Sequence, residues 1–420
     1  MSTQLAFTLV LLTVLSGFSV VIATGQPRDL EAHCWADKVK GWFHETFKAV
    51  TVLNQGIPAT ASHFTAQCVY DIVPFDADLV IVEFTVNDHA DRAIPFYSAD
   101  PSKENENVNC KGYERLIRKL LDFPNQPAVV AVHYWGLRHQ NMHLFWNTPE
   151  DHNDVVNKYY GVPAVSFRNA FYHLIMTQQE GYRPDQVYQD VIHPTALGHS
   201  YLAQITVDYL KQVLELLSVL PAASSQPQAP PLPPPLFPNN WPTKTFCKRG
   251  DSFKAIVKSA EGWTWRDGWK PGYETTTPGA VLKLAATLPI QGTDDPARTA
   301  QKLQVGVGYL ESYENMGVAT ITCESGCYCE PWELDAMHEQ RTSVEVFRKF
   351  QLHVPTHGSV ECIVSIANHP KSNSAGHKLK IMSFMLGEHE YVSPKDATFI
   401  SGELHGDLMK DPIWVSGDGT

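Results

Sequence analysis

The first half of the chain alternates continuous apolar runs with helical patterns. Residues 77–85 and 128–134 are apolar and rich in β-branched side chains, which is typical of buried strands, and residues 161–165 form a shorter run of this kind. Apolar side chains recur at helical spacing in residues 113–121 and 198–217. Strands that alternate with helices predict a parallel sheet with helices on both faces, and such sheets bind ligands at the carboxyl ends of their strands.

The second half has a different pattern. Its apolar runs are short and are separated by clusters of Gly, Pro and Ser, as at residues 305–310, 318–322 and 362–366. This spacing predicts an all-β domain of the sandwich type. Between the halves, residues 221–242 are rich in proline, which excludes a helix and favours an extended spacer. We therefore expect an interdomain linker there.

A further apolar run, Leu5 to Ala23, lies near the start of the sequence. Its end, Val21-Ile22-Ala23, could serve as the cleavage site of a secretory signal. No Lys or Arg precedes the apolar core, however, and the run is nearly long enough for a single N-terminal membrane anchor. We expect a secreted or cell-surface protein, with the anchor and a misassigned N-terminus as alternatives.

Composition limits the number of domains and the class of partner. The 420 residues, 43% of them hydrophobic, are too many for one ordinary domain and predict two. The net charge of −12 argues against a nucleic-acid partner, because the sequence has no basic stripe to neutralise phosphates.

The cysteines predict disulfides rather than a metal site. Five of the eight lie in the β-rich half: Cys247, Cys323, Cys327, Cys329 and Cys362. The spacing C-x3-C-x-C differs from the C-x2-C geometry of zinc sites, and His338 alone is poor support for a metal. For the cysteines of the first half, a disulfide and a buried thiol both stay open.

An aromatic group lies early in the second half and consists of Trp263, Trp265, Trp269 and Tyr273. These rings could stack against sugars. Trp263 and Trp265 alternate, however, and side chains two apart point to the same face of a strand. We therefore expect the rings to belong to the sandwich core.

The candidate chemistry begins with Asp190-Val191-Ile192-His193-Pro194, which precedes the last helix of the first half. A carboxylate three residues before an imidazole, on a loop that enters a helix, can orient the ring. The imidazole of His193 then acts as a base toward a hydroxyl nucleophile and as an acid toward the leaving group. By itself this pattern is common among surface and capping residues.

Two further signals follow predicted strands. Asn87 comes directly after the strand that includes Glu83, and its side-chain amide can donate to an oxyanion, although Asn-Asp is also ordinary turn chemistry. Gly56 follows the apolar residues 50–53, and a glycine lets the backbone approach a ligand and present its N–H. A plain strand-to-helix turn is the alternative for Gly56.

The order of these features resembles the SGNH (GDSL-like) hydrolases, with Gly after one strand, Asn-Asp after the next and Asp-x-x-His before the last helix. Residues 57–60, 76–80 and 83–88 are similar to the corresponding segments of plant and algal secreted-type members. The resemblance covers about residues 35–218. It implies a flavodoxin-like three-layer α/β/α domain that hydrolyses carboxylic esters without a cofactor.

The resemblance also implies roles for individual residues. Gly56 and Asn87 are expected to be the oxyanion donors, His193 the base and Asp190 its orienting partner. The second Gly of the family's glycine motif is Ala59 here. This change leaves the expected donor, Gly56, in place.

The departure from the family lies at its first motif, a strand followed by Gly-Asp-Ser or Gly-Gly-Ser, whose Ser attacks the acyl carbon. Here residues 18–25 read FSVVIATG. They could form a degenerate first strand with Thr24 near the place of the nucleophile. The alternatives are a truncated or mis-spliced sequence and a domain that has lost catalysis. Gly250-Asp251-Ser252 spells the missing motif beyond the linker, so Ser252 is not assigned as the nucleophile.

Five segments are therefore predicted: residues 1–25 as a signal-like segment or degenerate first strand, 26–220 as the SGNH hydrolase-type domain, 221–243 as the linker, 244–395 as the β-sandwich-like domain and 396–420 as a tail. The expected function is ester hydrolysis, impaired by the missing serine motif, with an acetylated polysaccharide or glycoconjugate as substrate. The alternative is a non-catalytic carbohydrate-binding or surface-interaction protein on the same scaffold.

Overall fold

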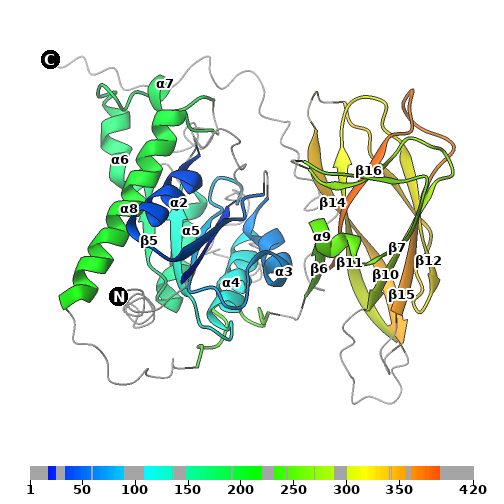
Figure 1. Cartoon of the computed structure of the whole chain (residues 1–420), viewed down its shortest axis with the longest axis horizontal. Coiled ribbons are helices and arrows are strands. Elements are labelled where there is room, and N and C mark those ends of the chain that lie inside the picture. The colour runs from blue at the N-terminus through cyan, green and yellow to red at the C-terminus, as the bar shows by residue number, and fades with distance from the viewer. Residues whose placement is uncertain are drawn as a thin grey trace, which may run out of the picture. The chain divides into compact units, whose positions relative to one another are not determined.

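A computed structural model describes most of the chain. The described residues are 18–24, 34–57, 60–88, 108–134, 136, 148–190, 193–219, 231–242, 245–268, 270–287, 300–339, 341, 343–355 and 361–387. The chain divides into two compact units between Pro242 and Thr243. Among the described residues, unit 1 precedes this boundary and unit 2 follows it (Figure 1).

Unit 1 is built on a parallel sheet of order β2-β1-β3-β4-β5. Its strands are β1 (Phe18–Thr24), β2 (Val50–Asn54), β3 (Leu79–Glu83), β4 (Ala128–His133) and β5 (Ala164–Ser166). Its helices are α2 (Trp35–Thr46), α3 (Ser62–Ile72), α4 (Val108–Leu121), α5 (Pro149–Tyr160), α6 (Phe167–Met176), α7 (Pro184–Val187) and α8 (Ala196–Val219). The predicted alternation of strands and helices is confirmed.

Helices cover both faces of this sheet. The apolar sides of α2, α6 and α8 share one core with alternate residues of the strands, among them Val20, Ile81 and Val130. On the other side, α3 and α5 pack against α4, which lies on β4. Because side chains alternate along a strand, strands covered on both faces must be apolar throughout, and β3 and β4 are buried at every position.

The end of the N-terminal apolar run is a strand of the core. β1 pairs with β2 on one side and β3 on the other, and Val20, Val21 and Ile22 are fully buried. Cleavage after Val21-Ile22-Ala23 would remove this interior strand, so the predicted cleavage site is wrong. A membrane-spanning helix over residues 5–23 is also incompatible with it; residues 5–17 lie outside the described part. No described helix is long and apolar enough to cross a membrane.

The predicted strand at 161–165 begins later than its apolar run. Gly161 ends α5 in the left-handed conformation, with φ 68°, and its N–H donates back to the helix. The other end of α5 carries a capping box at Thr148 followed by Pro149. β5 therefore starts only at Ala164.

Residues 231–242, here called the strap, pack on unit 1 instead of standing free as a spacer. Arg118 on α4 donates to the carbonyl of Pro233 at 2.6 Å, and Asn240 donates to Glu114 at 2.6 Å. The side chain of Phe237 is buried. A buried carboxylate and guanidinium on α4 need hydrogen-bond partners, and the strap supplies them. Residues 221–230 of the predicted linker lie outside the described part.

Unit 2 is a sandwich of two mostly antiparallel sheets, of order β13-β12-β15-β10-β7 and β14-β11-β16-β9-β8, with β6 paired to β16. Side chains of both sheets share one core. The strands are β6 (Phe246–Arg249), β7 (Val257–Glu261), β8 (Thr264–Arg266), β9 (Gly272–Thr275), β10 (Val281–Thr287), β11 (Ala300–Glu311), β12 (Val318–Ser325), β13 (Trp332–Asp335), β14 (Val344–Pro355), β15 (Glu361–Asn368) and β16 (Leu379–Gly387), and α9 (Gly250–Lys254) follows β6.

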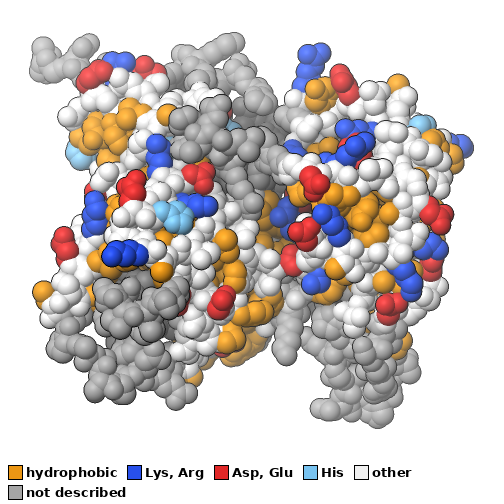
Figure 2. All heavy atoms as spheres, in the orientation of Figure 1, with side chains coloured by type: hydrophobic (Ala, Val, Ile, Leu, Met, Phe, Trp, Pro, Cys, Tyr) orange, Lys and Arg blue, Asp and Glu red, His pale blue; other side chains and the backbone are white. Residues whose placement is uncertain are grey.

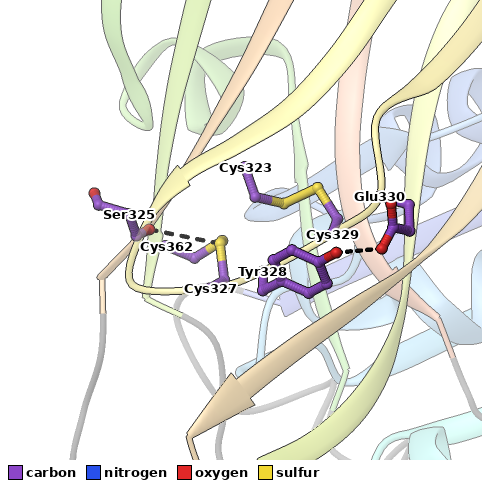
Figure 3. Close-up of a disulfide and its surroundings, with 7 residues drawn as sticks. All are labelled: Cys323, Ser325, Cys327, Tyr328, Cys329, Glu330 and Cys362. Carbon is purple, nitrogen blue, oxygen red and sulfur yellow. Dashed lines mark hydrogen bonds between the residues drawn. A yellow bond between two sulfur atoms is a disulfide. The ribbon is translucent and has the colours of Figure 1, made fainter.

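The cysteines of unit 2 confirm the preference for disulfides over zinc. Cys323 pairs with Cys329 and Cys327 with Cys362, so that two bridges flank Tyr328 (Figure 3). Among the described residues, no group of three or more His, Cys, Asp or Glu could hold a metal ion. In unit 1, the side chains of Cys34 and Cys110 are buried.

The aromatic group of unit 2 belongs largely to the core, as predicted. Trp263 is buried in the sandwich, and Trp265 packs edge-on against Tyr273 with ring centroids 5.1 Å apart. Trp269 lies outside the described residues. On the face drawn in Figure 2, Lys and Arg side chains are interspersed with Asp and Glu on both units.

Candidate active site

Asp190 and His193 form a hydrogen-bonded pair on the loop between α7 and α8. Asp190 Oδ2 lies 2.8 Å from His193 Nδ1, and its Oδ1 accepts from the His193 backbone N–H at 2.7 Å. The two side chains are 47% and 54% exposed. The carboxylate therefore fixes the ring by its Nδ1 edge, which makes Nε2 the nitrogen that can take a proton from a nucleophile.

This loop lies over the carboxyl edge of the sheet. Tyr188 and Pro194 form a β-bridge at its base. The ring of Tyr188 lies 6.4 Å from that of Tyr134 and 6.5 Å from that of Phe167, which directly follow β4 and β5. These aromatic contacts place the Asp190–His193 pair at the edge where the sequence predicts the site.

Gly56 lies just beyond β2, in a loop organised by Asn54. Asn54 Oδ1 accepts the Gly56 N–H at 3.0 Å, and Asn54 Nδ2 donates to Asp37 Oδ1 at 3.1 Å. The Gln55 N–H donates to Ile22 at 2.8 Å, which holds the loop beside the end of β1. The Gly56 amide must therefore exchange Asn54 for a substrate oxygen before it can bind an oxyanion.

Asn87 lies in the turn after β3 and is 8% exposed. The turn interpretation is confirmed, because the backbone N–H groups of Asn87 and Asp88 both donate to the carbonyl of Phe84. Asn87 Nδ2 also donates to the carbonyl of Thr60 at 3.1 Å, which ties the end of β3 to the loop that carries Gly56. The structure thus brings the two predicted donor segments into contact through Thr60.

The position of the family's nucleophile follows β1. Thr24 is the last residue of β1 and lies in register with Glu83, whose side chain is fully buried at the end of β3. Residues 25–33 lie outside the described part. Ser252 lies in α9 of unit 2, where its hydroxyl donates to the carbonyl of Arg249 and accepts the Arg249 N–H. The tripeptide around Ser252 is thus a helix start in the other unit.

Asp88 is a buried acid at this edge that sequence reasoning passed over as part of a turn. Its Oδ1 accepts the Ser62 N–H at 2.8 Å, and its Oδ2 accepts from Asn153 at 3.0 Å. Burial raises the pKa of Asp88 to about 6, against the opposing effects of these hydrogen bonds and of His133. The only sequence signal for Asp88 is its place after Asn87.

His133 ends β4 in a polar cluster that sequence reasoning also missed. Its side chain is buried, and its Nε2 lies 3.2 Å from Asn157 Nδ2 and 3.8 Å from Asp154 Oδ1. The contact with His133 is the largest cause that lowers the pKa of Asp154, and Lys158 adds to it. The continuous apolar run that ends at His133 gives no reason in the sequence to place these side chains together.

Comparisons with known proteins agree with this geometry. Residues 19–201 match the model of the GDSL-like lipase/acylhydrolase family. A comparison of the sequence with curated proteins found no match.

Among solved structures, the chain is similar to a two-domain esterase (CEX) active on acetylated mannans. In its co-crystal with mannopentaose, the alignment covers 93% of this chain and 96% of that chain at 18% identity, with a TM-score of 0.60. For a second structure of that esterase, the alignment covers 92% of this chain and 96% of that chain at 18% identity, with a TM-score of 0.61. At this identity the likeness shows the fold, which includes an α/β unit and a second unit. The match to the GDSL-like lipase/acylhydrolase family lies within unit 1, at residues 19–201.

Proposed function

We propose that unit 1 is a carboxylic-ester hydrolase of SGNH type. The observation that carries this proposal is the hydrogen-bonded pair Asp190–His193 at the carboxyl edge of the sheet, in a domain that matches the model of an acylhydrolase family. An imidazole held at Nδ1 by a carboxylate is the base that hydroxyl nucleophiles need. No cofactor takes part in this chemistry.

The proposed mechanism passes through an acyl-enzyme. As a hydroxyl oxygen attacks the ester carbonyl, His193 Nε2 takes its proton and Asp190 stabilises the imidazolium. The carbonyl oxygen becomes an oxyanion, which the N–H of Gly56 and the side-chain amide of Asn87 bind. The alcohol leaves with the proton from His193, and water then repeats the sequence on the acyl group. The nucleophile is unassigned, with Thr24 as the candidate at the end of β1.

We propose an acetylated polysaccharide or glycoconjugate as the substrate. Two observations support this. A GDSL-like domain is followed here by a β-sandwich unit, and the two-domain esterase of similar fold acts on acetylated mannans. The two disulfides of unit 2 fit an oxidising compartment, which supports a secreted or cell-surface location.

The second candidate function is non-catalytic binding of carbohydrate or of another surface on the same scaffold. One observation favours it. At the end of β1 the sequence reads Thr24-Gly25-Gln26, where the family has its serine motif. Removal of one member of a catalytic triad leaves roughly 10³–10⁴-fold catalysis over water. A trace of activity is therefore expected from either candidate, and only variants can separate them.

The decisive experiment installs the missing motif. Gln26→Asp combined with Pro27→Ser creates Gly-Asp-Ser directly after β1. We expect this variant to hydrolyse an aryl acetate at least about 100-fold faster than the natural chain. Adding His193→Ala should remove that gain. A folded variant without any gain would favour the binding function.

Single substitutions in the natural chain identify its own nucleophile. We expect Ser252→Ala to leave the low aryl acetate rate unchanged, because Ser252 lies in unit 2. If Thr24→Ala abolished the rate, Thr24 would be the working nucleophile. If Ser252→Ala abolished a robust rate, the assignment of the active site to unit 1 would be wrong.

A further inference from the structure

We propose that Asp88 is a positioning residue whose buried side chain ties the β2–α3 loop and helix α5 to the end of β3, and so sets where Gly56 and Asn87 lie. The proposal rests on the proposed function only for the roles of Gly56 and Asn87. The ties themselves are independent of catalysis.

The first tie holds the β2–α3 loop. Asp88 Oδ1 accepts the N–H of Ser62, the first residue of α3, which is fully buried. Next to it, Asn87 donates to Thr60, two residues earlier in the same loop. Asn87 and Asp88, which follow β3, thus form hydrogen bonds with the loop on both sides of Ala61. The part of the loop that leads from Thr60 back to Gly56 is therefore held in place at Thr60.

The second tie holds α5. Asp88 Oδ2 accepts from Nδ2 of Asn153, which is 2% exposed, at 3.0 Å. The Asp88 backbone N–H donates to Phe84 at 2.7 Å, so the turn that presents the carboxyl group is itself closed. One side chain therefore joins the end of β3 to segments 26 and 65 residues away in sequence. Both oxygens act as acceptors, which suits a carboxylate.

Titratable groups whose charges interact with Asp88 lie on α4 and β4. On α4, burial first and the charge of Asp88 second raise the pKa of Cys110; for Tyr113, burial is also the largest cause of a raised pKa, and Asp88 adds to it. Both groups are therefore neutral at physiological pH. On β4, His133 lowers the pKa of Asp88, but burial outweighs it.

Ionisation of Asp88 strengthens its two accepted hydrogen bonds, but the cost of burying the charge is larger and makes the closed arrangement less stable. The carboxyl group has a pKa of about 6 when buried and 3.8 when it is exposed to water. Its neutral form favours the closed arrangement, which is fully stable below about pH 4 and loses stability as the pH rises through about 6. A difference of about two pKa units permits a change of up to roughly 100-fold in the opening equilibrium. The donor segments are thus most firmly placed in mildly acidic solution.

Hydrogen exchange of the full chain, read by mass spectrometry for residues 55–69, tests this. After correction for intrinsic exchange, we expect the natural chain to open up to about tenfold more at pH 7.5 than at pH 5. In Asp88→Asn, Asn153 can turn its amide and keep both hydrogen bonds without a charge, so protection should be high at both pH values. Asp88→Ala loses both acceptors and should be poorly protected at both.

Asp78→Asn is the matched control. Asp78 also accepts a backbone N–H, from Ser19 at 2.9 Å, but beside the opposite end of β3. In Asp78→Asn, hydrogen exchange of residues 55–69 should depend on pH as it does in the natural chain. The proposal is overturned if the natural chain opens equally at both pH values, or if Asp88→Asn keeps the difference. These outcomes decide the role of Asp88 even if Asp88→Ala does not fold or ester hydrolysis is never detected.

Discussion

Polar side chains at the carboxyl edge of the parallel sheet are held by partners on other elements. Asn54 reaches Asp37 on α2, Asn87 reaches Thr60, and His133 reaches Asn157 on α5. A buried polar group without a hydrogen bond costs free energy, so each of these contacts also helps to fix the loop that carries it. Asn54 and His133, which have no proposed role in the reaction, therefore help to shape the candidate site.

The pH dependence of stability near His133 follows from Asp154. The pKa of Asp154 is lowered, first by His133, so its contribution to stability is present above an unfolded pKa of about 3.9 and is lost as the pH falls below it. Asp154→Asn should lower the free energy of unfolding by about 1–2 kcal/mol at pH 7. In urea denaturation this difference should shrink steadily between pH 5 and pH 3.

A surface acid provides the control for this prediction. Asp185 pairs with Arg183 at 3.2 Å, and the Asp185 side chain is 70% exposed. Asp185→Asn should change the free energy of unfolding little at any of these pH values, because exposed ion pairs contribute little. A loss in Asp154→Asn that stayed the same at pH 3 would show that its cause is packing and not charge.

At the scale of elements, two segments belong to unit 1 although their sequences resemble export and spacer segments. Residues 18–24 are the interior strand β1, and the strap lies on α4 and α5. In both cases the partners are distant in sequence. For β1 they are the strands β2 and β3, and for the strap they are Glu114 and Arg118.

The strap should detach when Glu114 is removed. The buried Glu114 carboxylate accepts from the backbone of Leu236 and Phe237 and from Asn240. Glu114→Ala leaves these donors without an acceptor and should lower the free energy of unfolding by about 3 kcal/mol. Thermolysin should then cut residues 231–242, which we expect to be resistant in the natural chain. Fragments are compared on reducing gels.

Tyr159→Phe is the control for the strap. It removes one exposed hydrogen bond, from the Tyr159 hydroxyl to the carbonyl of Pro234, and keeps the ring. It should leave digestion of the strap unchanged. Equal digestion of the natural chain and of Glu114→Ala within residues 231–242 would contradict the role given to Glu114.

The two disulfides of unit 2 should differ in their contribution to stability. Cys327–Cys362 spans 35 residues and Cys323–Cys329 spans 6. Constraint of the unfolded chain grows with loop length, so Cys327→Ala with Cys362→Ala should cost about 4 kcal/mol and Cys323→Ala with Cys329→Ala about 2 kcal/mol. Thermal unfolding of the two double variants measures the difference. The reverse order would mean that the shorter bridge acts chiefly on the native loop around Tyr328.

At the scale of the whole molecule, the chain consists of two units with separate cores. Its fold is similar to that of a two-domain esterase over 93% of its length. The position of β1 also indicates where the nucleophile is expected. Because the first strand of the sheet is residues 18–24, a serine of the family type is expected directly after Thr24. The active-site experiment therefore changes residues 26 and 27.

The sequence by itself determined the two classes of unit and the Asp190–His193 pair. Continuous apolar runs that alternate with helical patterns predict a covered parallel sheet, because burial on both faces leaves no polar position in a strand. The pair is three residues apart, so its hydrogen bond depends on local geometry alone. Whether His193 faces Gly56 and Asn87 across one cleft stays a prediction.

Only the tertiary structure decided between a signal and a strand for residues 18–24, and between a spacer and a bound segment for the strap. An apolar run of seven residues has the same composition in either role, and what makes it a strand is pairing with residues 50–54 and 79–83. Asp88 likewise acquires its role from Ser62 and Asn153. These contacts join distant parts of the chain, and no local pattern records which buried donor a given acceptor will meet.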